Sequence, residues 1–167
     1  VGAHLCVPAG SLHAICEGIV LAEIQQNSDT TYRVYDWNRV GKDGKPRELH
    51  VDKALDVINF DQVEPNFAEP TPVSESNGSK ITVLCQNEYF ITDRIFMDAG
   101  AEYTGNCDGT TLEIWGILQG SAILGEMELS PVQFILLPAA MGEYKLEAQK
   151  DTILLRATLP KPGRKGC

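Results

Sequence analysis

The residues best placed to do chemistry stand near the start of the chain, where Gly2, Pro8, Gly10 and His13 follow one another in the order G-x5-P-x-G-x2-H. Proline and glycine together favour a tight turn between two strands. A histidine just beyond such a turn carries an imidazole that, in its neutral form, can bind a divalent metal ion. His13 is therefore a candidate metal ligand; the alternative is a histidine with a structural role alone.

This order of residues resembles the second conserved motif of the cupins, a family of jelly-roll barrels that often hold a metal ion. The resemblance implies that His13 points into the barrel and binds the metal there. The next stretch, residues 21–39, is similar to the active-site sequence of type I mannose-6-phosphate isomerases in their short bacterial form. It includes the run Q-Q-N-S-D-T-T-Y-R-V-Y-D at 25–36, and G-K-P-R-E-L-H at 44–50 continues the likeness. Residues 80–160 are a weaker match to the small C-terminal barrel of those enzymes.

The resemblance implies an enzyme that interconverts mannose 6-phosphate and fructose 6-phosphate with one zinc ion, by moving a proton between C1 and C2 through an enediol-like intermediate. His13 would hold the zinc together with residues that precede this motif in the family. Arg33 matches the active-site arginine and Asp29 the acidic residue four positions earlier, so both are assigned to catalysis. Arg39 stands where the family carries a cation suited to the phosphate, and it is assigned with Glu23 to substrate binding.

Each role agrees with the chemistry of its side chain. Zinc can polarise the sugar oxygens, and a guanidinium keeps its charge at any working pH, which suits an enediolate or a phosphate. Glu23 and Asp29 can orient Arg33 or bind sugar hydroxyls, and strand alternation would place Glu23 and Gln25 on one face. In the alternative interpretation, Arg33 and Arg39 are ordinary ion-pair residues, and the two carboxylates are structural hydrogen-bond partners.

The elements that must position these side chains are predicted to be mostly strands. We expect short strands at 4–7, 19–26 and 32–37. Apolar residues at helical spacing predict one short helix near 50–58, with His50 at its start. The intervening Lys42, Lys45 and Arg47 lie in a polar sequence and are expected to form a solvated loop.

The composition changes after residue 60. Residues 61–79 are rich in Pro, Glu, Ser and Asn, which predicts a linker. The sequence beyond it is β-like almost throughout, with strands expected at 80–86, 88–97, 111–118, 120–124, 132–137, 142–148 and 151–158. Many short strands at close spacing are typical of a sandwich or barrel of the jelly-roll kind.

A faint repeat relates the two parts of the chain. A strand ending in Pro-Ala-small occurs at Leu5–Gly10 and again at Leu136–Ala140, and superposing the prolines places Glu143 opposite His13. We therefore predict an all-β protein of cupin-type jelly-roll barrels with the following parts: 1–60, the C-terminal part of a catalytic barrel; 61–79, a linker; 80–160, a complete second barrel without a metal; and 161–167, a tail.

The family's first metal-binding motif, Q-x-H or H-x-H with a later glutamate, would have to precede Gly2. A catalytic zinc needs about three protein ligands, so His13 alone cannot hold it well. The chain is therefore expected to be either a fragment of a longer enzyme, inactive by itself, or a natural half-protein that has lost the chemistry, and zinc is expected only in a complete active site. Unpaired barrel strands expose backbone groups that invite association, and a homodimer in which these strands pair between copies is one arrangement that would satisfy them.

The composition also argues against two classes of protein, those that bind nucleic acid and those that span a membrane. With 14 Lys+Arg and 23 Asp+Glu in 167 residues, the formal net charge is −9. Such an acidic chain is not expected to bind nucleic acid, and its longest apolar run, Phe134–Met141, is too short to cross a membrane. The five cysteines form no C-x-x-C pair, and the start of the chain has no signal-peptide pattern, so we expect free thiols and a cytoplasmic location.

Two other functions stay open. A non-catalytic cupin-like protein that binds a phosphosugar or another carbohydrate would keep Arg33, Arg39 and the acidic residues and would need no metal. A sugar-nucleotide epimerase on the same barrel would need a catalytic histidine with a carboxylate partner and a tyrosine. Only His13 has the support of a motif, so we rank this third function last.

Overall fold

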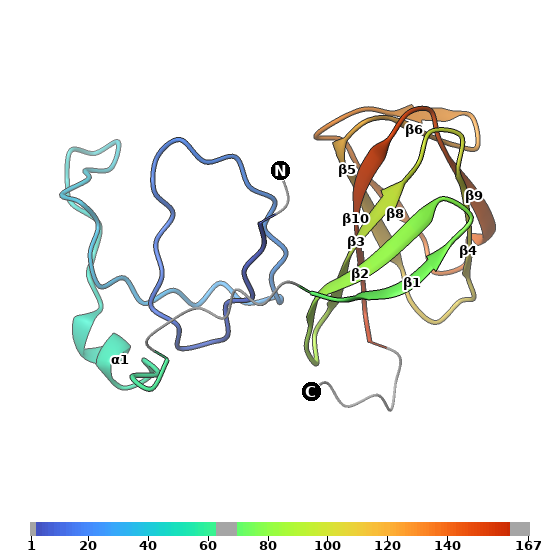
Figure 1. Cartoon of the computed structure of the whole chain (residues 1–167). Helices are drawn as coiled ribbons and strands as arrows, with labels where there is room; N and C mark the ends of the chain where they lie inside the picture. The colour runs from blue at the N-terminus through green and yellow to red at the C-terminus, as the bar shows by residue number, and fades with distance from the viewer. Residues whose placement is uncertain (1–2, 63–69, 161–167) are drawn as a thin grey trace. The chain divides into compact units, whose positions relative to one another are not determined.

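The chain divides into two compact units in a computed structural model that describes residues 3–62 and 70–160 (Figure 1). One unit is Leu5–Asn66, and the other is Phe67–Cys167 with Val1–His4. The elements are α1 (Val51–Leu55), β1 (Pro72–Ser76), β2 (Ser79–Gln86), β3 (Ile91–Met97), β4 (Glu102–Cys107), β5 (Glu113–Gln119), β6 (Ala122–Leu124), β7 (Met127–Leu129), β8 (Phe134–Leu137), β9 (Gly142–Ala148) and β10 (Thr152–Thr158).

The C-terminal unit consists of two antiparallel sheets. One has the strand order β1-β2-β3-β10-β5-β8 and the other the order β4-β9-β6-β7. From β3 onward the chain passes repeatedly from one sheet to the other, which is how a jelly roll is built. The predicted all-β, jelly-roll class is therefore confirmed.

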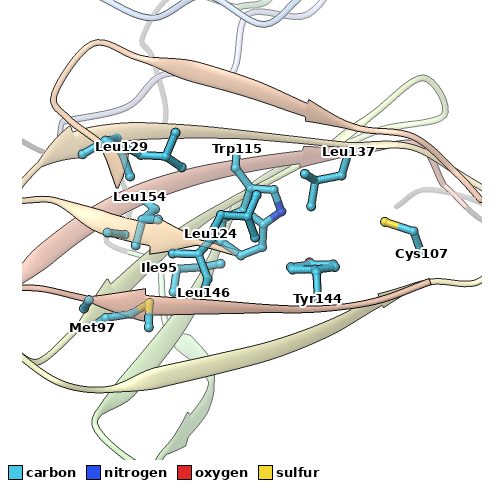
Figure 2. Close-up of a cluster of buried hydrophobic side chains, with 13 residues drawn as sticks. Ile95, Met97, Cys107, Trp115, Leu124, Leu129, Leu137, Tyr144, Leu146 and Leu154 are labelled. Atoms are coloured by element: carbon cyan, nitrogen blue, oxygen red, sulfur yellow. The ribbon is translucent and has the colours of Figure 1, made fainter. Parts of the chain in front are cut away.

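Alternation along the strands explains how the two sheets come to pack against each other. In β9, Tyr144, Leu146 and Ala148 are buried while the residues between them are exposed. Figure 2 shows the inward side chains meeting between the sheets, with Trp115 of β5 and Leu154 of β10 facing Leu146. Burial of these apolar side chains is the main force that stabilises this unit.

Two polar groups in this interior are satisfied by a single carboxylate oxygen. Oε2 of Glu113 accepts a hydrogen bond from the Trp115 indole nitrogen at 2.9 Å and another from the Tyr144 hydroxyl at 2.6 Å. Burial, and secondly the hydrogen bond to Glu113, raise the pKa of Tyr144 far above its ordinary value. Tyr144 therefore stays a neutral hydrogen-bond donor at any physiological pH.

An ion pair occupies a neighbouring part of the same interior. The Arg156 guanidinium donates to Oδ2 of Asp93 at 2.6 and 3.0 Å, and it also contacts the Tyr103 hydroxyl. Its charge lies over the rings of Tyr103 and Trp115, at 5.8 and 5.6 Å from their centroids. The aromatic rings and this ion pair lie together between the two sheets, whereas Glu143, the counterpart of His13 in the repeat, is exposed.

The strands of the C-terminal unit agree closely with the sequence analysis. Each of the seven strands expected after residue 79 is present, with ends shifted by up to three residues, and α1 lies within the predicted 50–58 helix. Strands β4 and β7 were not expected. Strand β1 lies inside the segment expected to be a linker, 61–79, of which 63–69 lie outside the described residues. Asn77 and Gly78, both with positive φ, form the two-residue hairpin turn between β1 and β2.

The N-terminal unit contains little regular secondary structure in its described residues, and the prediction of three strands there is wrong. Its described residues contain α1 and one isolated bridge, Val40 to Pro46, but no strand at 4–7, 19–26 or 32–37. An extended segment becomes a strand only when a neighbour accepts and donates its backbone hydrogen bonds, and the described residues offer no such neighbour. Most of the exposed large apolar side chains of the described residues lie in this unit, including Val20, which is 95% exposed.

Two further expectations concern the cysteines and the membrane. Cys16 and Cys107 are free thiols, as expected, whereas Cys6 and Cys85 are disulfide-bonded, so the expectation of free thiols is wrong for these two. Within the described residues, no helix has both the length and the apolar character needed to cross a bilayer.

The packing of the C-terminal unit predicts a large cost for truncating Leu146, which is 0% exposed. Leu146→Ala should lower the free energy of unfolding of this unit by about 2–5 kcal/mol, because the cavity it leaves cannot fully collapse. Urea unfolding followed by Trp115 fluorescence in a Trp37→Phe background measures this. The matched control is Leu136→Ala in β8, where the side chain is exposed and a change within about 0.5 kcal/mol is expected. Equal losses in the two variants would contradict the assigned core.

Candidate functional site

The predicted turn before His13 is present and is held against the end of the helical segment. The amide of Ser11 donates to the Pro8 carbonyl at 3.2 Å, and the amide of Asn59 donates to the Gly10 carbonyl at 2.9 Å. Gly10 has a φ of +85°, and a Cβ added there would lie 2.6 Å from the carbonyl oxygen of Val57. Only glycine therefore fits at this position without a shift of the backbone.

His13 follows this turn as an exposed side chain, with Nδ1 3.0 Å from the carbonyl oxygen of Ser11. It was expected to point into a barrel, but the described residues of the N-terminal unit enclose no barrel interior. Within the described residues, no group of three or more His, Cys, Asp and Glu side chains comes together to hold a metal. The described residues therefore do not make a zinc site by themselves, and the metal role of His13 stays a prediction.

Arg33, by contrast, is fixed on several sides. Its amide donates to Nδ1 of His50 at 3.2 Å, and its carbonyl accepts from the His50 amide at 2.7 Å. The guanidinium donates through Nη1 to the carbonyl of Glu48 at 3.2 Å, and Nε lies 4.0 Å from Oδ1 of Asp36. The side chain is 23% exposed, and in the described residues Nη2 has no protein acceptor. One face of the guanidinium is thus available to a ligand.

Asp36 is the centre of this arrangement and is buried. The Arg47 guanidinium donates to both of its carboxylate oxygens, through Nε to Oδ2 at 2.7 Å and through Nη2 to Oδ1. The hydrogen bond from Arg47 holds the pKa of Asp36 below its ordinary value against the opposing effect of burial, and the charges of Arg47, Arg33 and Arg39 act in the same direction as that bond. Three guanidinium groups around one carboxylate leave an excess of positive charge in a strongly acidic protein.

Arg39 joins this cluster through its backbone and an aromatic neighbour. Its amide donates to the Asp36 carbonyl at 2.9 Å, and its exposed guanidinium lies 5.5 Å from the centroid of the Trp37 ring. Trp37 in turn packs against Tyr35, with ring centroids 5.4 Å apart. Asp36 is thus a buried carboxylate between two exposed aromatic residues.

Two predicted site residues lie apart from this cluster. Glu23 and Asp29 are exposed, and Asp29 lines an open depression formed by Gln25–Asp29. Residues 19–26 form no strand, so the strand alternation from which a common face of Glu23 and Gln25 was expected is absent, and both side chains are exposed. Within the described residues, no hydrogen bond or ion pair links Glu23 or Asp29 to Arg33. Their assigned roles stay predictions.

Three residues that were not predicted to belong to the site also take part in this cluster. Asp36 was not singled out, and Arg47 was expected in a solvated loop, yet the two form the tightest ion pair of the unit. His50 does precede α1, but its side chain makes no capping hydrogen bond and instead accepts from Arg33. The available signal was the position of Asp36, the carboxylate between two aromatic residues in an arginine-rich stretch.

Curated proteins that are similar to this chain are mannose-6-phosphate isomerases. The probable mannose-6-phosphate isomerase GmuF of Bacillus subtilis is 35% identical over 150 residues, which cover 87% of this chain and 46% of that protein. The mannose-6-phosphate isomerase of Streptococcus mutans is 42% identical over 89 residues, 53% of this chain and 27% of that protein. No family model matches the chain.

Solved structures agree with this result. The crystal structure of the mannose 6-phosphate isomerase from Bacillus subtilis superposes with a TM-score of 0.64 at 29% identity, covering 81% of this chain and 42% of that one. The chain is similar to the C-terminal part of mannose-6-phosphate isomerases. It spans about half the length of the curated relatives it matches. An RmlC-like cupin from Shewanella frigidimarina, at a TM-score of 0.50 and 16% identity, shares the fold.

The pKa of Asp36 gives a direct test of the arginine cluster. Because its folded-state pKa lies below the unfolded value, the ion pair stabilises the fold above the unfolded pKa and is lost as the pH falls through the lower, folded pKa. A carbon-detected NMR titration should place the Asp36 midpoint below the ordinary value of 3.8. In Arg47→Gln the midpoint should rise, because the principal hydrogen-bond donor is gone. The same midpoint in both proteins would contradict the cluster.

Proposed function

We propose that this chain forms part of a zinc-dependent mannose-6-phosphate isomerase and supplies the arginine side of its active site. The observation that carries the proposal is the cluster of Arg33, Arg39 and Arg47 around Asp36, in a chain homologous to those enzymes. A sugar phosphate carries about two negative charges near neutral pH, and guanidinium groups recognise phosphate oxygens through paired hydrogen bonds. The proposed substrate pair is mannose 6-phosphate and fructose 6-phosphate.

In the proposed isomerisation, Arg33 and Arg39 would have different roles. A proton leaves C2 of the aldose and is delivered to C1, while the hydroxyl proton of O2 is replaced by one at O1, so that the intermediate carries negative charge on its oxygens. Arg33, held with one face free, is proposed to stabilise that charge. The more exposed Arg39 is proposed to bind the phosphate, and Glu23 the sugar hydroxyls. Asp29 is proposed to orient Arg33 during catalysis.

Zinc dependence belongs to this proposal, with His13 as the ligand that this chain contributes. Bound zinc would act as a Lewis acid on the sugar oxygens. Since the described residues provide no group of three ligands, the other ligands are proposed to come from outside them, and the 167-residue chain alone is proposed to be inactive. The cytoplasmic location stays a prediction.

The second candidate function is a non-catalytic protein that binds phosphosugars. The observation that favours it is the contrast within the described residues, where the arginine cluster is assembled but no metal-binding group is. This function would require the cluster alone. It differs from the first in one testable respect, because binding would be independent of zinc.

Calorimetric titration of the chain with mannose 6-phosphate, in the presence of a chelator, tests the arginine cluster. Binding is expected in the millimolar range or tighter, with mannose alone giving no signal. Arg39→Gln should weaken binding about tenfold, because a charge-assisted hydrogen bond contributes about 1.5 kcal/mol. The control Arg94→Gln, in β3 of the other unit, should bind normally. Absence of binding at millimolar ligand would count against both functions.

A coupled assay for fructose 6-phosphate tests whether the chain suffices for catalysis. With zinc added, no turnover is expected from the chain alone, because His13 is the one predicted ligand it supplies. Zinc titration monitored by equilibrium dialysis should likewise show no tight stoichiometric site. Tight binding of one zinc per chain together with turnover would overturn the proposal that residues from elsewhere complete the site.

The homodimer is a further proposal, supported by the unpaired extended segments and exposed apolar side chains of the N-terminal unit. Sedimentation velocity should show a dimer that Val20→Asp weakens, because a charge cannot be buried there without a partner. Val132→Asp is the control, since Val132 is also highly exposed but lies in the C-terminal unit. A monomer at all concentrations would contradict the dimer.

A further inference from the structure

The segment around Arg33 depends on a histidine that belongs to no predicted site. His50 and Arg33 exchange two hydrogen bonds, from the Arg33 amide to Nδ1 of the ring at 3.2 Å and from the His50 amide to the Arg33 carbonyl at 2.7 Å. The two residues are 17 positions apart in sequence. This exchange resembles one rung of a sheet in which a side chain replaces one backbone acceptor.

The geometry assigns a tautomer to His50. Nδ1 can accept a hydrogen bond from the Arg33 amide only when the ring proton is on Nε2. Nε2 lies 3.7 Å from a carboxylate oxygen of Glu48, and the ring of Tyr32 is next to it, with centroids 6.1 Å apart. The neutral Nε2–H form is therefore the one that completes this arrangement.

We infer that His50 is a positioning residue for Arg33, acting through the backbone of that arginine, while Asp36 and the Glu48 carbonyl hold its side chain. The inference rests on the proposed role of Arg33 in the isomerase. With Nε beside Asp36 and Nη1 on Glu48, the guanidinium has few orientations left, and Nη2 is the donor that remains for a substrate oxygen. Restricting the guanidinium before the substrate binds lowers the entropy cost of that contact.

The test measures the order of Arg33 in the ligand-free chain by NMR. In the natural sequence, nitrogen-15 shifts should show His50 protonated at Nε2, and the Arg33 amide should be protected from hydrogen exchange. His50→Ala should accelerate that exchange more than tenfold. His50→Asn should restore protection, because its side-chain oxygen occupies about the position of Nδ1. Lys53→Ala, an exposed change in α1, is the control and should leave exchange unchanged.

Asp36→Asn provides an independent arm that leaves the backbone pair in place. It should broaden the Arg33 Nε–H signal while the Arg33 amide keeps its protection, and Asp61→Asn should alter neither. Fast exchange of the Arg33 amide in the natural chain, a His50 proton on Nδ1, or equal exchange in His50→Ala and Lys53→Ala would overturn the inference. Should His50→Ala fail to fold, the tautomer and the His50→Asn variant still decide.

Binding of mannose 6-phosphate is measured separately on the same proteins, so that the two proposals can fail independently. If Arg33 is ordered by His50, His50→Ala should bind about tenfold more weakly and His50→Asn near normally. Ordered Arg33 with no sugar phosphate binding in any variant would refute the proposed function and leave the positioning intact. Normal binding by a His50→Ala chain with a disordered Arg33 would refute the positioning role.

Discussion

Backbone amide and carbonyl groups must find partners when they leave water, and this requirement separates the two units of the chain. In the C-terminal unit ten strands pair into two sheets, and the paired backbone brings the alternating apolar side chains together as a core. In the N-terminal unit the described residues have sequences with the same β character but almost no pairing. Their backbone is held instead by short-range turns, by the contact of the Gly10 carbonyl with the Asn59 amide, and by the exchange between Arg33 and His50.

In the N-terminal unit, side chains therefore provide contacts that the paired strands provide in the C-terminal unit. The carboxylate of Asp36 draws Arg47 and Arg33 to one point, and the His50 ring substitutes for a strand neighbour. The same contacts leave one donor of Arg33 uncommitted and keep Arg39 at the surface over Trp37. The groups that determine the local fold are thus also the ones that would orient cations toward an anionic ligand, which explains why so little regular structure can still present a defined site.

The sequence was sufficient for those features whose cause is local. The β-like sequence after residue 79 predicted a strand at β9, helical spacing predicted α1, and proline followed by glycine predicted the turn before His13. It was insufficient wherever a distant partner decides the outcome. The segment 19–26 has the residue pattern of a strand, but no neighbouring segment within the described residues pairs with it. The ion pair between Asp36 and Arg47 joins the two ends of a loop whose conformation no local pattern predicts. Strand β1 was not predicted, because it and its hairpin turn, Asn77-Gly78, lie in a stretch rich in residues that are typical of linkers.

The candidate site residues fall into two groups that are not in contact within the described residues. Arg33, Arg39 and Asp36 are joined by hydrogen bonds and ion pairs, whereas His13, Glu23 and Asp29 are exposed, and within the described residues no bond links them to that cluster. A reaction that requires a metal ligand and a guanidinium on the same sugar needs these two groups at a fixed separation, because a misplacement of about 1 Å can cost a hundredfold in rate. The contacts that hold Arg33 fix the orientation of its guanidinium but not its distance from His13, so the described residues meet only one half of this requirement.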